Sequence, residues 1–461
     1  MNPPIQETKL GIPVLLENGD FEELRRVCGE SHPALVAEEL ETLDPQRLWD
    51  ALKHLDPTLM ADIFSHFDEG YQLQVVDFLN RREFAQLLAE MAPDDRADLF
   101  KHLSDEQRET VLPALAQAER EDIRRLSAYE EGTAGAVMTS DYATVLPGLT
   151  VGQAIEHLRD VAPDRETIYY AYVVDDQHRL LGFVSLKDLV TARRGEIIDT
   201  LVQKETIRCR VNDDQEEAAH LIQKYDLLAL PVIDGQERLV GIITHDDAMD
   251  ILTYEQTEDM EKLMAIAGGH EPISYIKTPV LNHFRNRFPW VVALAVIGLV
   301  SGFIVQSFET LLDQFVILAA FMPMLADTGG NTGSQAATLV VRALALDEIV
   351  SGDFFRILWK ELRISLMLAL LLGIIAYGRV LLYSGTSIDG PEYSIGLIGL
   401  AIALALGLQV VTSTLIGALL PLAAHKVKLD PALVASPAIT TVVDISGLLI
   451  YFSTVKVVLG V

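Results

Sequence analysis

One carboxyl group lies near the middle of an apolar stretch close to the C-terminus. Residues 431–455 carry no charge other than Asp444. As a helix that rises about 1.5 Å per residue, this stretch would span roughly 37 Å, which exceeds the hydrocarbon core of a bilayer, about 30 Å. Asp444 would then lie near the bilayer midplane, where a carboxylate is costly and is a functional-site candidate. We expect it to face a water-filled or protein-lined cavity. The alternative is a hydrogen bond that joins two helices.

A second polar stretch interrupts the apolar C-terminal half. Residues 322–345 read MPMLADTGGNTGSQAATLVVRALA. Gly329, Gly330 and Gly333 would loosen a helix or permit close backbone approach. Polar side chains at membrane depth belong against other helices or a cavity, and we therefore expect a pore lining here. Its expected members are Asn331, Thr332, Ser334 and Gln335.

The net charge of −30 is unevenly distributed over the 461 residues. The first 280 residues hold 55 of the 66 acidic and 26 of the 36 basic side chains, whereas the remainder is nearly neutral and apolar. A strongly negative surface repels nucleic acid and attracts cations, divalent ions above all. We expect divalent metal ions and no nucleic acid as partners. A solvated acidic surface that keeps the protein soluble is the alternative.

The two cysteines indicate the compartment. Cys28 and Cys209 are too few and too far apart for a disulfide framework or a thiolate metal site. A reducing compartment follows for this half of the chain. The first residues, MNPPIQETKL, lack a basic region followed by an apolar run, so we expect no cleavable signal peptide.

Residues 1–130 read as a succession of short amphipathic helices with Leu, Phe and Val at helical spacing. Helices of this kind predict an all-α superhelical domain. Asp94, Asp95 and Asp98 crowd one predicted helix N-terminus, where the helix dipole and a bound metal ion explain them equally well.

A repeat of two strands and a helix start follows. VVDDQHRLLGFVSLKDLV from Val173 matches VIDGQERLVGIITHDDAM from Val232 at an offset of 59 residues. The repeat resembles a tandem pair of α/β CBS domains over residues 138–252. In that family the hydroxyl and carboxylate after the second strand can hold a nucleotide, with helix capping as the alternative. The matching positions are Ser185, Asp188, Thr244 and Asp247.

An acidic helix is predicted between the repeat and the apolar half, over residues 253–280. Glu255, Glu258 and Asp259 share one face of this helix. Like charges on one face destabilise a helix unless a cation or a basic partner neutralises them. We expect a regulatory connecting helix, with a solvated face as the alternative.

Five membrane-spanning helices are predicted in residues 281–461. They cover residues 288–308, about 312–341, about 364–383, 393–424 and 431–456. Most lysines and arginines flank one side of these spans. The positive-inside rule then places the N-terminal half in the cytoplasm and the C-terminus outside. We expect a multi-pass protein of the cell (inner) membrane, in contact with lipid.

The polar stretch at 322–345 and the sequence PALVASPAITTVVDISG around Asp444 resemble the MgtE family of magnesium channels. The order of parts matches as well: a helical superhelix, a CBS pair, an acidic connecting helix and five spans. The resemblance covers nearly the whole chain. It implies a multidomain membrane protein that is not an enzyme and that conducts Mg²⁺ into the cytoplasm.

The resemblance also implies a homodimer with a pore along its axis, lined by the second and fifth spans. Symmetry would bring two Asp444 carboxylates to one Mg²⁺ ion. Mg²⁺ gives up its waters reluctantly, so we expect the hydrated ion to be bound through water. Ala438, Thr440 and Ser436 are the further pore residues implied.

Closure at high cytosolic Mg²⁺ is a further family property, with the ions shared among acidic cytosolic residues. The corresponding positions are Asp94, Asp95, Asp98, Asp214, Asp226, Asp247, Asp250, Glu255, Glu258, Asp259 and Asp430. ATP is implied as a regulatory ligand, and the positions that match its contacts are Tyr170, Lys187, Asp188 and Thr244.

Three other classes compete with this interpretation. The triplet Asp327-Thr328-Gly329, together with Asp444, would fit an intramembrane aspartyl protease if the two carboxylates lie within hydrogen-bond reach. A CBS-regulated anion channel would need basic or helix-dipole donors within the spans. A membrane-anchored nucleotide sensor would leave Asp444 and the polar second span unexplained. No His-Glu-x-x-His motif occurs, which excludes a zinc intramembrane protease of that type.

Overall fold

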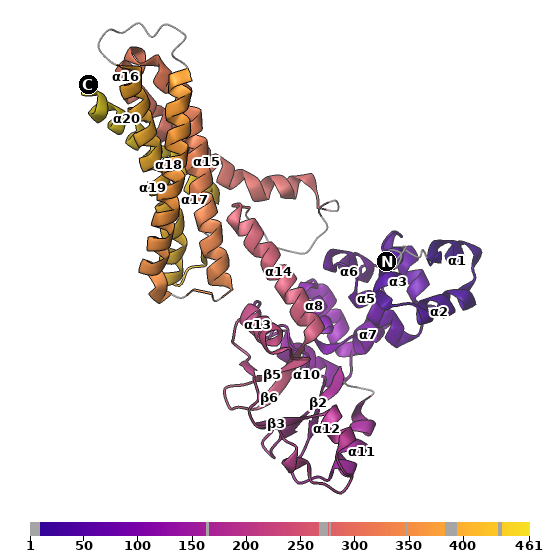
Figure 1. The fold of residues 1–461 in the computed structure, drawn as a ribbon. Helices are drawn as coiled ribbons and strands as arrows, with labels where there is room; N and C mark the ends of the chain where they lie inside the picture. Colours follow the sequence, from indigo (N-terminus) through magenta and orange to yellow (C-terminus); the bar gives the residue numbers. More distant parts are fainter. Residues whose placement is uncertain are drawn as a thin grey trace, which may run out of the picture. The chain divides into compact units, whose positions relative to one another are not determined.

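The chain forms two compact units, Met1–Glu255 and Gln256–Val461 (Figure 1). The computed structural model describes residues 10–162, 166–266, 275, 278–346, 348–349, 351–382, 394–431 and 436–461. The first unit holds a helical domain followed by an α/β domain, and the second unit is a bundle of long helices.

The first unit begins with ten short α-helices, and from α3 onward they pack mainly against the helix two positions along the chain. This alternation builds the superhelix that the sequence predicts. Asp44 and Asp56 cap α4 and α5, and each helix then begins with proline. The helices are α1 (Ile12–Asn18), α2 (Phe21–Glu30), α3 (Pro33–Leu40), α4 (Pro45–Leu52), α5 (Pro57–Ser65), α6 (Glu69–Val76), α7 (Arg81–Glu90), α8 (Pro93–His102), α9 (Asp105–Val111) and α10 (Gln117–Leu126), with the 3₁₀ turn η1 (Leu112–Ala114).

The α/β domain consists of two three-stranded sheets with one topology. Val173 pairs with Gly182 in one sheet, and Val232 pairs with Gly241 in the other. Val232 and Gly241 follow Val173 and Gly182 by 59 positions each. The pairing of the strands therefore confirms the repeat that the sequence predicts. The first copy contains β1 (Tyr142–Val145), α11 (Val151–Val161), β2 (Thr167–Val174), β3 (Leu180–Ser185), α12 (Leu186–Thr191) and η3 (Ile198–Thr200); the second contains β4 (Cys209–Arg210), α13 (Gln215–Tyr225), β5 (Ala229–Ile233) and β6 (Leu239–Thr244).

Helix α14 (His245–Leu263) follows β6 directly and passes from the first unit into the second. Residues 267–274 and 276–277 of the predicted connecting segment lie outside the described residues. The remaining elements are α15 (Val280–Ser307), α16 (Glu309–Gln314), η4 (Val316–Phe321), α17 (Met322–Ala345), η5 (Ser351–Asp353), α18 (Phe354–Leu382), α19 (Ile395–Lys426) and α20 (Ser436–Leu459).

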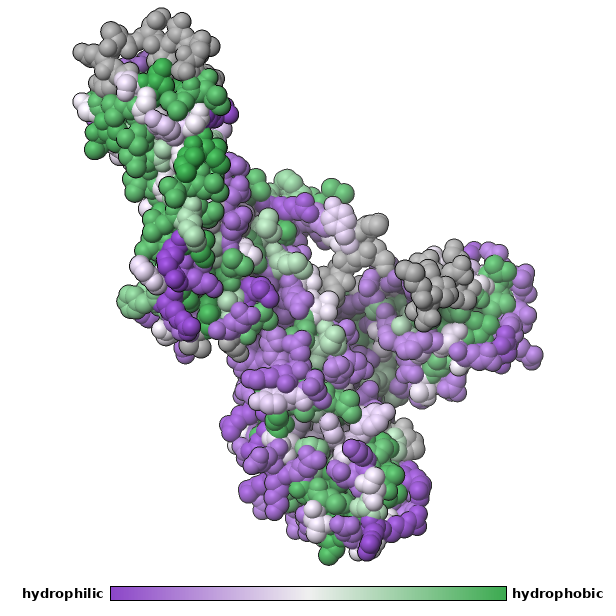
Figure 2. All heavy atoms as spheres, viewed as in Figure 1, coloured by the Kyte–Doolittle hydropathy of each residue, from purple (hydrophilic) through white to green (hydrophobic). Residues whose placement is uncertain are grey.

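Four of these helices are long and apolar enough to cross a membrane: α15, α18, α19 and α20 from Pro437. Hydrophobic residues cover much of the visible surface of this bundle, whereas hydrophilic residues predominate on the first unit (Figure 2). The polar helix α17 has 24 residues. At about 1.5 Å per residue it is long enough to be the fifth span.

The predicted start of the second span, near Leu312, is wrong. The chain there forms the short helix α16 and the 3₁₀ segment η4, and α17 begins at Met322 with Pro323 in its first turn. The hydroxyl of Tyr451 on α20 donates a hydrogen bond of 3.0 Å to the carbonyl of Leu318 in η4. This tertiary contact stabilises the 3₁₀ segment η4. Because the residues of η4 are apolar, hydropathy alone does not show that the α-helix begins only after it.

Candidate functional site

Asp444 lies in the middle of α20 and is partly buried. Its Oδ1 atom is buried and accepts no hydrogen bond from any described residue. A buried polar atom without a partner costs free energy, so a group outside the described chain is required to satisfy it. The alternative of a helix-joining hydrogen bond therefore has no support at this oxygen.

One turn before Asp444, Thr440 meets the polar helix α17. The Oγ1 atom of Thr440 lies 3.4 Å from Oγ of Ser334. A Cβ atom added to Gly330 would lie 2.8 Å from the methyl carbon of Thr440, so glycine permits this contact. Ala438 is partly buried, and the side chain of Ser436 lies outside the described part of the structure.

The face of α17 that is exposed in the single chain is polar. Asp327, Asn331 and Gln335 are exposed and recur every four residues, so they share one side of the helix. The side-chain amide of Asn331 donates a hydrogen bond of 3.2 Å to Asp327. Polar groups on a membrane helix avoid lipid, so this face requires a cavity or another protein surface.

Thr332 lies on the other side of α17. It is buried, and its hydroxyl donates hydrogen bonds to the carbonyl of Thr328 at 2.9 Å and to Ser413 of α19 at 3.3 Å. The structure thus separates Thr332 from the exposed residues Asn331 and Gln335.

The three glycines of α17 permit close helix packing and do not interrupt the helix. A Cβ atom on Gly417 of α19 would overlap the carbonyl oxygen of Gly333, and one on Gly333 would lie 2.8 Å from Oγ of Ser413. Of the two roles that the sequence leaves open, close approach is the one the structure confirms.

Among the buried polar residues of α19, Gln409 and Ser413 bind the neighbouring helix and were not predicted from the sequence. The amide of Gln409 donates a hydrogen bond of 3.0 Å to the carbonyl of Leu325, and the Ser413 hydroxyl donates one to the carbonyl of Gly329. The sequence does contain an indication of these two residues, because two polar residues one turn apart in an apolar span predict a contact with another helix.

The protease alternative needs two carboxylates that share a proton. No hydrogen bond joins Asp327 to Asp444 within the described residues; Asp327 accepts one from Asn331 instead. The dyad that defines an aspartic protease is therefore not formed within this chain.

In the first unit, acidic residues from the helical domain and from the α/β domain influence one another. Burial, followed by the charges of Asp95, Asp247 and Glu166, raises the pKa of Asp94 well above its usual range. The Oδ1 atom of Asp94 is buried without a hydrogen-bond partner among the described residues. Burial likewise raises the pKa of Asp95, opposed by a hydrogen bond from Ser65.

Glu166 is a member of this group that the sequence analysis missed. Partial burial of its carboxyl group and the charges of Asp247 and Asp246 raise the pKa of Glu166 to about 7. Burial raises the pKa of Asp247 to about 6, although the hydroxyl of Thr244 donates a hydrogen bond to it. Glu166 begins the segment that leads into β2, far from the acidic runs, so no sequence pattern marks it.

Other predicted sensing residues have local roles. Asp214 caps α13 by accepting a hydrogen bond of 2.8 Å from the backbone of Glu216. Asp226 ends the same helix in a left-handed conformation with φ of 50°. Asp98 pairs with Lys101 at 2.8 Å. Asp250 lies on the exposed side of α14, near Asp246 of the same helix.

The acidic helix α14 is neutralised in part by side chains. Gln215 donates a hydrogen bond to Glu255 within the first unit. In the second unit, Lys262 lies 3.0 Å from Glu258 and 2.8 Å from Asp430, the residue that precedes the loop into α20. Asp259 is partly buried on the same helix. A lysine therefore already links two predicted sensing carboxylates.

No preformed metal cage is present in the described part of the chain. No three His, Cys, Asp or Glu side chains there are gathered closely enough to hold an ion. The group around Asp94 is thus a set of mutually repelling carboxylates that a cation could bridge with water between them.

Of the predicted nucleotide residues, Lys187 and Asp188 lie in the first turn of α12, Thr244 ends β6 just before α14, and Tyr170 lies in strand β2. The Ser185 hydroxyl accepts a hydrogen bond of 3.1 Å from the backbone of Asp188 and donates one of 2.6 Å to its carboxylate. This is the capping alternative for Ser185. Lys187 is exposed, and the ring of Tyr170 packs against Phe183 at 4.9 Å.

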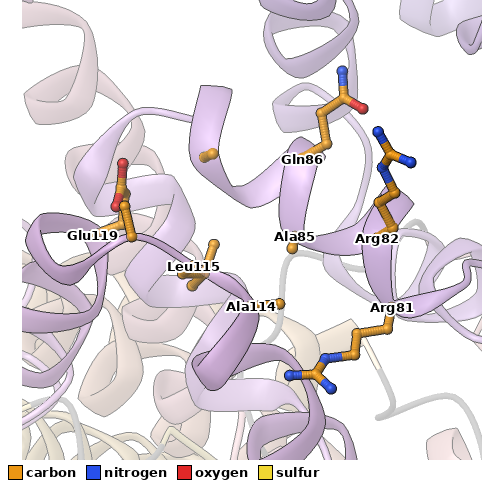
Figure 3. A pocket seen from close by; sticks show the side chains of 9 residues that line it. Arg81, Arg82, Ala85, Gln86, Ala114, Leu115 and Glu119 are labelled. Atoms are coloured by element: carbon orange, nitrogen blue, oxygen red, sulfur yellow. The ribbon is translucent and has the colours of Figure 1, made fainter.

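A hollow of about 450 Å³ lies between α7 and the segment from η1 to α10 (Figure 3). Alanines form much of its lining, with Arg81, Arg82 and Glu119 among its polar residues. None of its lining residues belongs to the candidate set.

A helical domain and an α/β repeat joined by an acidic helix to a bundle of long apolar helices define a multidomain membrane protein. Sequence families match in the same order: the MgtE intracellular N domain over residues 31–132, the CBS domain over 134–195 and 198–254, and the MgtE divalent cation transporter family over 322–454. The chain belongs to the MgtE family.

Relatives cover almost the whole chain. The magnesium transporter MgtE of Thermus thermophilus is 35% identical, with 98% of this chain and 99% of the relative covered. That of Bacillus subtilis is 32% identical, with 98% and 97% covered. The cytosolic domain of the Mg²⁺ channel MgtE, solved in complex with ATP, aligns with a TM-score of 0.50 at 33% identity and covers 52% of this chain and 99% of that one.

Proposed function

We propose that this protein carries Mg²⁺ across the membrane into the cytoplasm and closes when Mg²⁺ accumulates there. The observation that carries the proposal is Asp444, a carboxylate in the middle of an apolar helix with one buried oxygen that no described residue satisfies. Membership of a family whose relatives are named magnesium transporters supports Mg²⁺ as the ion.

The transport path runs between α17 and α20 of two copies of the chain. Each copy contributes one Asp444, and the exposed polar face with Asp327, Asn331 and Gln335 supports a lining that needs a second copy to enclose it. Two carboxylates across a two-fold axis balance the charge of one Mg²⁺ ion. The ion keeps its inner waters, which bridge to the carboxylates, to Thr440 and to backbone carbonyls near Ala438.

Closure results from Mg²⁺ bound to acidic cytosolic residues. The group of Asp94, Asp95, Asp247 and Glu166 is the strongest candidate, because burial, followed by the charges of neighbouring carboxylates, raises the pKa values of Asp94, Asp247 and Glu166. A divalent ion stabilises the compact arrangement in which these carboxylates are close, and its loss lets their repulsion separate the helical domain from the CBS pair.

The helix directions support a cytoplasmic N-terminal half and an external C-terminus. The ion pair between Lys262, before α15, and Asp430, between α19 and α20, joins two segments that are separated by four spans, α15, α17, α18 and α19. An even number of spans places both segments on one side of the membrane. Most basic residues that flank the helices belong to that side.

ATP is proposed as a regulatory ligand of the CBS pair. The related cytosolic domain solved with ATP supports this ligand. Tyr170, Lys187, Asp188 and Thr244 are the residues proposed to contact it, with the carboxylate of Asp188 as an acceptor for ribose hydroxyls.

Mg²⁺ uptake into lipid vesicles by the Asp444→Asn variant tests the pathway. We expect uptake to fall by about 100-fold or more, because removing one partner of a buried charge pair costs about 3–5 kcal/mol. Asp313→Asn is the matched control, since Asp313 is an exposed carboxylate on the short helix α16. Wild-type uptake by Asp444→Asn would contradict the proposal.

A further inference from the structure

Gln409 is buried among the helices of the proposed pathway, although it is not part of the exposed polar face. Its side chain on α19 is only 1% exposed. A primary amide has two N–H donors and an acceptor oxygen, and burying it among apolar groups costs free energy unless these are bonded. A polar residue at such a position in a membrane helix has a specific contact to make.

That contact is with α17 and α20 together. The Nε2 atom of Gln409 donates a hydrogen bond of 3.0 Å to the carbonyl of Leu325 on α17. A Cβ atom on Gly329 of α17 would overlap this nitrogen, and a Cβ atom on Gly447 of α20 would overlap it too. The amide therefore occupies a space that one glycine on each neighbouring helix leaves open.

Ser413 repeats the contact one turn further along α19. Its hydroxyl donates a hydrogen bond to the carbonyl of Gly329 and receives one from Thr332 at 3.3 Å. Two side chains of α19 thus bind carbonyls of α17 that are four residues apart, Leu325 and Gly329. These bonds set the position of α17 along its axis as well as its distance from α19.

Gln409 alone extends this contact to α20 near the candidate ion site. Gly447 follows Asp444 by three residues, so the two lie on adjoining parts of one helix surface. The amide carbonyl, Oε1, is buried and accepts no hydrogen bond from a described residue. The orientation of the amide accordingly depends on the Leu325 carbonyl and on the two glycines.

We propose that Gln409 is a positioning residue for ion selection, which rests on the proposed Mg²⁺ pathway. Its amide fixes the spacing between the α17 turn at Gly329 and the α20 turn that carries Asp444. Mg²⁺ requires a small site of nearly fixed geometry, whereas Ca²⁺ accepts larger and more flexible ones. Without the amide the two helices shift relative to each other, and discrimination against Ca²⁺ falls.

The test is the ratio of Mg²⁺ to Ca²⁺ uptake rates for the full-length chain in lipid vesicles. Gln409→Met removes the amide at nearly constant length, and Gly447→Ala displaces the amide without changing it. We expect both variants to lower the ratio by about fivefold, the factor that corresponds to one buried hydrogen bond. An unchanged ratio in both variants would overturn the proposal.

Thr414→Val is the matched control. Thr414 is a buried polar residue on the same helix, 2% exposed, but its hydroxyl donates to the carbonyl of Val410 within α19. This variant loses a buried hydrogen bond that lies within α19 and does not join it to α17 or α20, so we expect the ratio of the wild type. An equal loss of selectivity in the control would assign the effect to general destabilisation and overturn the positioning role.

A double-mutant cycle separates the contact from the transport function. Thermal unfolding is measured for Gln409→Ala, Gly447→Ala and the combined variant. We expect the unfolding temperature of the combined variant to fall by less than the sum of the two single decreases, because the alanine side chain at position 447 no longer meets an amide. Additive losses would overturn the contact itself. If the wild-type protein transports no Mg²⁺, the proposed function is wrong. The double-mutant cycle of unfolding temperatures would still show whether the Gln409 amide joins the helices.

Discussion

At the scale of single residues, the chain keeps carboxylates where their charge is costly. Asp444 and Asp94 each have a buried oxygen without a hydrogen bond from the described residues, one in the helical bundle and one in the cytosolic unit. Such atoms are rare in folded proteins because each costs free energy. Water or a hydrated divalent cation would satisfy both, and Mg²⁺ is the cation that the protein is proposed to carry.

The pH dependence of the cytosolic unit follows from the same carboxylates. The pKa is raised to about 7 for Glu166 and to about 6 for Asp247, above the values of the unfolded chain. Their protonated forms stabilise the folded state, and this stability is lost as the pH rises through about 6 to 7. Without divalent ions we therefore expect the unfolding temperature to be roughly 2–4 °C higher at pH 5 than at pH 8.

Thermal unfolding of the metal-free protein at the two pH values checks this prediction. Glu166→Gln combined with Asp247→Asn should flatten the dependence, since the amides do not titrate. Mg²⁺ should stabilise the wild type more at pH 8, where it does not compete with protons. A higher unfolding temperature at pH 8 in the absence of metal would contradict the assignment.

At the scale of elements, glycines decide how closely the membrane helices pack. A Cβ atom on Gly417 would overlap a backbone carbonyl of α17, and backbone atoms cannot move aside as a flexible side chain can. Gly417→Ala should therefore lower the free energy of unfolding by about 1–3 kcal/mol, as overpacking does.

Gly407→Ala on the same helix is the matched control. A Cβ atom there would lie 3.6 Å from Cβ of Ala369, which is an ordinary contact. Because alanine favours helix over glycine, this variant should be unchanged or more stable by up to about 1 kcal/mol. Unfolding of the detergent-solubilised variants measures both, and equal stability of the two would refute the packing argument.

Patterns local in sequence predicted most of the elements. The 59-residue repeat predicted two strands and a helix start in each copy, and capping residues such as Asp44 marked where the short helices begin. The start of α17 was misplaced because η4 is as apolar as a helix and is held by Tyr451, more than 130 residues away. Gln409 was missed although a second polar residue, Ser413, lies one turn away in the same apolar span. Glu166 was missed because Asp247 and Asp246, whose charges raise its pKa, are distant from it in sequence.

At the scale of the whole molecule, the amino-acid composition and the order of the domains predicted the division of the chain and its family. The acidic first half and the nearly neutral second half became two compact units, with α14 as the covalent link between them. Family membership was predictable because two membrane motifs and the domain order agree. How the ions are shared among the sensing carboxylates was not predictable, since like-charged side chains far apart in sequence leave no periodic signal.

The most direct test is Mg²⁺ uptake into vesicles in which Mg²⁺ is set separately on the two sides, with the protein in known orientation. We predict that raising Mg²⁺ on the side of residues 1–255 closes the wild type. Removal of residues 1–130 should shift closure to higher concentrations while uptake through Asp444 continues. Uptake that does not respond to Mg²⁺ on that side, or that is abolished by the truncation, would contradict the account.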